Sequence, residues 1–332
     1  MPDRAGVLMH AFVKMKTVFN KLLVVALALF PLRWARAGNN GYFVTYNSDV
    51  ERGEVEVMLM NDITSPSPVR RADGQGDYLS HMLELEYGVT SQLATEFMIE
   101  GFVDLESGKS RFGGFRWETR YRLFRERVPL NPMLYAEYED LDPSARFKME
   151  ISGWVLPPYR VGGTGERSRE RIVETRLVLS DRVGPVDLAF NAVLETEIST
   201  GTIAFGYAMG AMWMPGHGSG SCAVRPPAEH PHDATPGCAC RMSMPGCHCG
   251  HCSGSGDSCG CAHAGMVGVG IEMFGGLGDS IVFGLRPGRQ EHYLGPILMY
   301  HVTPRFMFHS QLAIGLSETS DQIARVNLGY EL

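Results

Sequence analysis

The residues with the clearest chemistry are cysteines and histidines gathered in one short part of the chain. All 8 cysteines lie between Cys222 and Cys261, and six of the 11 histidines lie between His217 and His263. Cys-x-Cys and Cys-x-x-Cys spacings let neighbouring side chains reach one ion, and thiolates with imidazoles select zinc, copper(I) and similar soft ions. The predicted metal ligands are Cys222, Cys238, Cys240, Cys247, His248, Cys249, His251, Cys252, Cys259, Cys261 and His263.

The same segment has two other interpretations. An even number of cysteines in an oxidising compartment is typical of disulfides, and eight cysteines allow 105 pairings. Disulfides alone leave the concentration of histidines unexplained, and the third interpretation is a neutral low-complexity insertion. Residues 215–265 are rich in Gly, Ser and Pro and show no strand or helix periodicity, so the sequence predicts a long inserted loop.

The first 37 residues have the pattern of a signal peptide. Lys14, Lys16 and Lys21 precede an apolar run at 22–30, and Ala-Arg-Ala at 35–37 fits signal-peptidase cleavage. That run is shorter than the roughly 20 residues that a membrane-spanning helix needs. The sequence therefore predicts an exported chain whose mature part is 38–332.

The mature part is acidic. Six of the 30 Lys+Arg and one of the 37 Asp+Glu lie within residues 1–37, which leaves 24 basic against 36 acidic residues. Binding to phosphate backbones requires a basic surface, so we expect no nucleic-acid partner.

Most of the mature chain alternates with a period of two residues, as β-strands do. In the clearest case Arg116, Glu118, Arg120 and Arg122 alternate with mostly apolar neighbours up to Leu123. The same alternation recurs along the chain and predicts about twelve strands, at 53–63, 77–89, 92–104, 112–124, 131–139, 170–180, 185–197, 201–214, 266–275, 292–302, 305–316 and 321–332.

Three features favour a membrane barrel over a periplasmic β-sandwich. Many segments reach the 9–11 residues of a tilted transmembrane strand. The chain ends on an alternating strand at 324–332, apolar at Leu332 and aromatic at Tyr330. Aromatic residues lie near the predicted strand ends, as interfacial girdles do; they are Tyr42, Phe43, Tyr46, Phe102, Phe112, Phe115, Phe124, Trp213, Tyr293 and Phe306. The predicted fold is an all-β, antiparallel, up-and-down transmembrane barrel in the outer membrane of a Gram-negative-type bacterium.

The charged faces of the strands must then line the barrel interior, because charge is tolerated only against water or other charges. The interior is either a polar pore or a salt-bridged filling. An inward row of small residues from Ala204 to Gly210 leaves room on that side and favours a pore. The predicted lumen residues are Glu96, Glu100, Arg116, Glu118, Arg120, Arg122, Glu174 and Arg176.

The strand count also predicts a side for the cysteine-rich loop. Counting back from a periplasmic C-terminus, residues 215–265 join the eighth and ninth strands on the periplasmic side. A separate strand at 280–284 would reverse this and place the loop outside the cell.

A resemblance to known proteins extends over roughly 53–332, except 215–265. The patterns at 54–57, 85–90, 118–123 and 302–306 resemble small outer-membrane barrels grouped loosely as transporters, including phenol meta-pathway and metal-resistance types. The terminal strand resembles the signal that the barrel-assembly machinery reads. The resemblance implies a transport function, with outer-membrane lipid, that machinery, and small solutes or metal ions as partners.

Catalysis has no support in the sequence. Phosphate-loop and His-Glu-x-x-His signatures are missing, and we predict no catalytic residue. The first functional hypothesis is a channel or transporter component whose loop captures zinc or copper(I). The second is a structural or metal-sequestering protein with a plugged barrel and a disulfide-stapled loop, and the third is an outer-membrane enzyme.

Overall fold

The computed structural model describes residues 41–72, 74–142, 169–198, 201–214, 266–303 and 305–332. The predicted signal peptide and all the predicted metal ligands, from Cys222 to His263, lie outside the described residues. Among the described residues, no helix is long and apolar enough to span a membrane.

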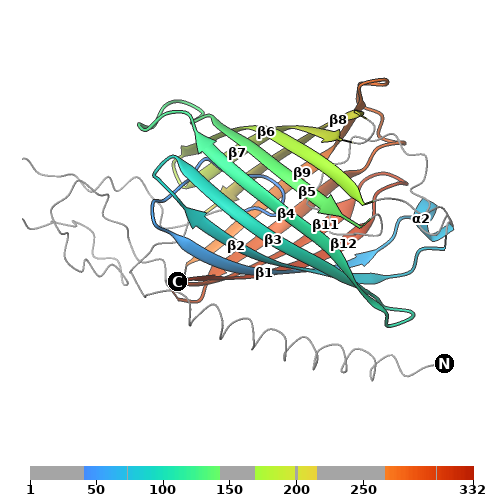
Figure 1. Ribbon diagram of the computed structural model, residues 1–332. Helices are drawn as coiled ribbons and strands as arrows, with labels where there is room; N and C mark the ends of the chain where they lie inside the picture. Colours follow the sequence, from blue (N-terminus) through green and yellow to red (C-terminus); the bar gives the residue numbers. More distant parts are fainter. Residues whose placement is uncertain (1–40, 73, 143–168, 199–200, 215–265, 304) are drawn as a thin grey trace, which may run out of the picture.

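Twelve antiparallel strands close into a single barrel (Figure 1). Each strand pairs with its neighbours in sequence, and the first strand pairs with the last. The strands are β1 (Val55–Ser65), β2 (Tyr78–Gly88), β3 (Leu93–Asp104), β4 (Ser110–Arg122), β5 (Met133–Leu141), β6 (Glu170–Val183), β7 (Val186–Glu197), β8 (Ile203–Trp213), β9 (Val267–Asp279), β10 (His292–His301), β11 (Phe306–Gly315) and β12 (Gln322–Glu331).

The predicted number of strands and their up-and-down order are confirmed. The largest boundary difference is in β9, which was expected to end at residue 275 and continues to Asp279. Residues 280–284 contribute one isolated bridge, between Gly278 and Phe283, and no separate strand. The even strand count therefore holds.

The alternation in sequence becomes an apolar outside and a polar inside. On β4, the outward Trp117 is 59 % exposed whereas the inward Arg116 is 1 % exposed. The same outward face of other strands carries large exposed apolar side chains, among them Leu85, Phe97, Leu134, Leu177 and Ile271. An apolar surface of this extent is stable in lipid rather than in water. Within lipid, only a closed barrel pairs the backbone N–H and C=O groups of every strand. The chain is an outer-membrane β-barrel.

The two ends of the barrel differ in the length of their connections. β2 joins β3, and β6 joins β7, by short turns at the end where the C-terminus lies, whereas β1 joins β2 at the opposite end through the helix α2 (Pro68–Ala72) (Figure 1). Outer-membrane barrels have short periplasmic turns and longer external loops, so the C-terminal end faces the periplasm. β8 ends and β9 begins at this same end, so the long connection between them is an exception to the short turns there, and its periplasmic side stays a prediction.

Candidate functional site

Residues 41–50, here called the plug, lie inside the barrel and form no strand. Tyr42, Phe43 and Tyr46 are 4 %, 7 % and 4 % exposed. They were predicted to belong to an interfacial girdle, and that prediction is wrong for them. It is also wrong for Phe102 and Tyr293, which are buried, whereas Phe112, Phe124 and Trp213 are exposed on the outer surface.

A single carboxylate on β9 holds the centre of the plug. Glu272 accepts hydrogen bonds from the backbone N–H of Val44 at 2.8 Å, Thr45 at 2.5 Å and Phe43 at 3.4 Å. Gln311 on β11 donates to the same carboxylate at 2.6 Å. Hydrogen bonds to an ionised acceptor are about twice as strong as neutral ones, so Glu272 is the main anchor of the plug.

The opposite side of the plug is tied to β6 and β7. Asn191 accepts from the Tyr46 N–H at 2.7 Å and donates to the Tyr46 carbonyl at 2.9 Å. Arg176 donates to the Val44 carbonyl at 2.5 Å, and Ser180 accepts from the Ser48 N–H at 2.9 Å. Backbone groups that would be orphaned inside a barrel therefore find side-chain partners on the wall.

The Tyr46 ring lies in a polar aromatic cluster. Its hydroxyl donates to Glu118 at 2.8 Å, and its ring centroid is 4.9 Å from that of Tyr135. The guanidinium carbons of Arg120 and Arg176 lie 5.2 and 5.1 Å from the same centroid. These contacts are within cation–π range, so the plug joins the charged residues of β4 and β6 into one network.

Tyr42 fills the space beside the row of small residues on β8. A Cβ added at Gly210 would lie only 2.3 Å from a ring carbon of Tyr42, so this glycine is needed for the close approach. Burial and the nearby carboxylates of Asp187 and Glu272 raise the pKa of the Tyr42 phenol, which stays protonated and donates to the Asp187 carbonyl at 2.9 Å. The expected open path along Ala204 to Gly210 is therefore wrong, because the plug occupies it.

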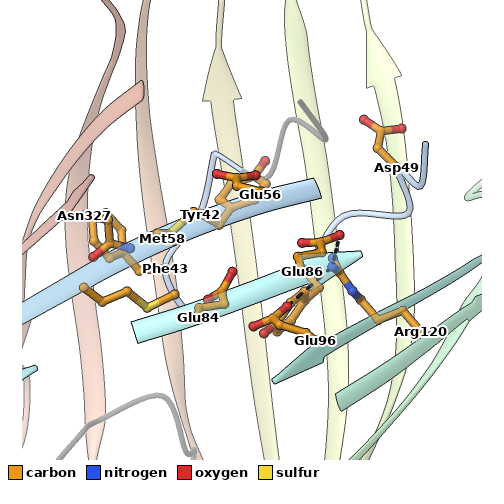
Figure 2. Close-up of a pocket in the computed structure, with 12 residues that line it drawn as sticks. Tyr42, Phe43, Asp49, Glu56, Met58, Glu84, Glu86, Glu96, Arg120 and Asn327 are labelled. Atoms are coloured by element: carbon orange, nitrogen blue, oxygen red, sulfur yellow. Dashed lines mark ion pairs between the residues drawn. The ribbon is translucent and has the colours of Figure 1, made fainter. Parts of the chain in front are cut away.

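A small cavity remains between the plug and the strands β1 to β3 (Figure 2). Its volume of about 30 Å³ holds a water molecule or a bare ion. One carboxylate oxygen from each of Glu84, Glu86 and Glu96 lies within 4.8 Å of the others. Arg120 forms ion pairs with Glu86, with Glu96 at 3.5 Å and with Glu118 at 2.8 Å. The other lining residues are Tyr42, Phe43, Tyr46, Asp49, Glu56, Met58, Met60 and Asn327.

The predicted lumen residues are buried in the barrel, with one exception. Arg122 lies at the periplasmic end of β4, half-buried, and donates to the carbonyls of Ser91 and Arg125. The predicted lumen residues that are buried are Glu96, Glu100, Arg116, Glu118, Arg120, Glu174 and Arg176.

The interior is both salt-bridged and strongly acidic. Arg116 contacts Glu100 at 3.1 Å, Glu137 at 3.2 Å and Glu139 at 3.4 Å, and Arg176 pairs with Glu174. Among the described residues, however, fourteen Asp and Glu are buried against four Arg. A hydrated lumen with this composition attracts cations.

The sequence interpretation missed the plug and its anchors Asn191 and Ser180. Two signals could have found them. Residues 41–50 are apolar and aromatic yet lie before the first alternating strand, and the inward small residues of β8 leave a volume that a packed interior must fill.

The structural neighbours of the chain are distant from it in sequence. No family model matches the chain, and no curated protein matches it. Among solved structures, an outer-membrane channel from Pseudomonas putida F1 is 14 % identical, with a TM-score of 0.42, over 86 % of this chain and 97 % of that one. The NanC porin is 6 % identical, with a TM-score of 0.41, over 83 % of this chain and 100 % of that one. The outer-membrane protein Omp33 of Acinetobacter baumannii is 9 % identical, with a TM-score of 0.32, over 84 % of this chain and 98 % of that one. The assignment of this chain as an outer-membrane barrel rests on its own closed sheet and apolar outer face.

Proposed function

We propose that the protein is a cation-conducting outer-membrane channel or transporter component that the plug holds closed. The observation that carries this proposal is that the lumen is filled by a separate segment, not by the side chains of the wall alone. The plug packs apolar side chains into the lumen and is anchored to the wall by hydrogen bonds that water can replace, so its displacement opens the lumen without breaking the sheet. Export by the signal at 1–37 and insertion by the barrel-assembly machinery, which reads β12, belong to the same proposal.

The acidic lumen predicts the ion preference of the open state. In a planar bilayer with a KCl gradient, the reversal potential of open events should have the sign of cation preference, because buried carboxylates outnumber arginines. Replacing both Glu84 and Glu96 with Gln should move that potential toward zero. A reversal potential of the anion-selective sign would contradict the proposal.

The Cys/His-rich segment adds a metal-binding function to this proposal, with zinc or copper(I) as cofactor or cargo. Its support is the sequence alone: soft ligands at chelating spacing, inserted between β8 and β9. The wider resemblance to phenol meta-pathway or metal-resistance barrels stays a prediction of the same kind.

Deleting residues 216–264 should abolish stoichiometric zinc binding by the reduced protein and leave the barrel folded, because β8 and β9 stay intact. Replacing His248, His251 and His263 with Ala should lower the zinc affinity if the imidazoles are ligands. Thiolates bind metal in the deprotonated form, so binding should release protons and weaken as pH falls. Protein isolated with four disulfides, no free thiol and no metal would instead identify a disulfide-stapled loop.

The alternative is a permanently plugged structural barrel. The three carboxylates around Arg116 favour it, since such a network fills the lumen of a barrel that never opens. Bilayer recordings separate the two, because folded protein that never conducts, even after the plug is loosened, supports the structural function.

A further inference from the structure

The lumen wall carries two methionines and two histidines where β10 meets β11. Met299 and His301 on β10, and Met307 and His309 on β11, are all at most 4 % exposed. The strand register places Met299 opposite His309 and His301 opposite Met307. Residues directly opposite each other in an antiparallel pair have Cβ atoms about 4.5–5.5 Å apart. The four side chains therefore share one small area of the wall, here called the Met–His patch.

His309 gives an independent reason to expect a ligand there. It is 1 % exposed, and neither ring nitrogen has a hydrogen-bond partner among the described residues. Its aromatic neighbour is Phe43 of the plug, with ring centroids 6.1 Å apart. A buried polar group without a partner is costly, and a neutral imidazole nitrogen is satisfied by a metal ion as well as by a hydrogen bond.

Further thioethers lie next to the patch. A Cβ placed on Gly268 would lie 3.0 Å from the Met299 methyl group and 3.3 Å from the Met212 sulfur, so these two side chains are neighbours. Met58 belongs to the same buried cluster and lines the cavity beside Glu84. Barrel interiors are ordinarily polar, so a cluster of methionine side chains at this position of the wall is unusual and points to a function.

We propose that the Met–His patch binds a soft monovalent metal ion of the copper(I) class. Thioether and imidazole ligands are neutral and suit copper(I) and silver(I), whereas magnesium, calcium and manganese take oxygen ligands. Phe43 of the plug packs edge-on against His309, so the ion and the plug meet at the same place. This inference goes beyond the proposed function and does not require conduction, because a closed barrel can hold the ion equally well.

Silver(I), which is redox-inert under these conditions, is a suitable probe. The full chain is reduced, its cysteines are alkylated, and it is folded into detergent in chloride-free buffer with silver nitrate, so that entry past the plug is not needed. After gel filtration, silver per chain is measured by mass spectrometry. The wild-type protein should retain about one more silver ion than the Met307→Leu/His309→Leu variant. Met133→Leu, which changes a buried lumenal methionine in a different cluster, should retain as much silver as wild type.

Equal silver in the wild type and the double variant would overturn the proposal and leave these methionines as apolar filling. Leucine is apolar and of similar volume, so the double variant should fold. Folding is checked on a detergent gel, where a closed barrel migrates faster unheated than after boiling. If it does not fold, methyl-labelled methionine spectra of the wild-type protein decide the question. Silver must then shift the Met299 and Met307 methyl signals and leave that of Met133 in place; unshifted Met299 and Met307 signals would also reject the site.

Discussion

Replacing Glu272 with Gln should turn a mostly closed barrel into one that conducts frequently. The substitution removes one charge and puts an amide group in front of three backbone N–H donors of the plug. Each charge-assisted hydrogen bond that becomes neutral or is lost costs on the order of 1 kcal/mol, so the plugged state should lose about 2–3 kcal/mol. About 1.4 kcal/mol corresponds to a tenfold change in an equilibrium constant. The ratio of open to closed time should therefore rise roughly 30- to 100-fold in single-channel recordings.

Glu100→Gln is the matched control. It removes the same charge from the same lumen, but Glu100 pairs with Arg116 of the wall at 3.1 Å. Its open probability should stay near that of wild type. If both variants conduct alike, the effect comes from lumen charge and not from the plug.

Replacing Arg116 with Met should cause a large loss of stability. Arg116 is 1 % exposed and is the shared partner of Glu100, Glu137 and Glu139. Breaking a buried ion pair leaves an uncompensated charge, at a cost of about 3–5 kcal/mol. The midpoint of urea unfolding in detergent should fall accordingly, and the Arg116→Met/Glu100→Gln/Glu137→Gln variant should recover part of the loss.

Arg122→Met tests whether burial is the cause. Arg122 lies on the same strand, but it is half-buried at the barrel end and bonds to two carbonyls. Its loss should cost no more than about 1 kcal/mol. Equal destabilisation by Arg116→Met and Arg122→Met would contradict the ion-pair network as described.

The wall of the barrel could be predicted from the sequence because strand periodicity is a local property. Alternation around Trp117 and Arg116 identifies both the strand and its two faces, and the charged face can only point into the lumen of a membrane barrel. The inward positions of Glu96, Arg120 and Arg176 follow from the same rule.

The plug could not be predicted in this way, because its partners are distant in sequence. Val44 meets Glu272, and Tyr46 meets Asn191, across more than a hundred residues, and neither pairing leaves a periodic signal. Arg122 shows a second limit. Its place in the alternation is correct, but whether a residue lies mid-barrel or at the rim depends on strand tilt and register, which alternation does not encode.

The central claim is that residues 41–50 close the lumen, and deleting them tests it most directly. Wild-type protein and the deletion variant are compared in planar bilayers, after both have been shown to migrate faster unheated than boiled. The account predicts rare openings for wild type and a persistently open, cation-preferring channel for the deletion variant. A folded deletion variant that conducts no more than wild type would contradict it, because the wall side chains would then fill the lumen without the plug.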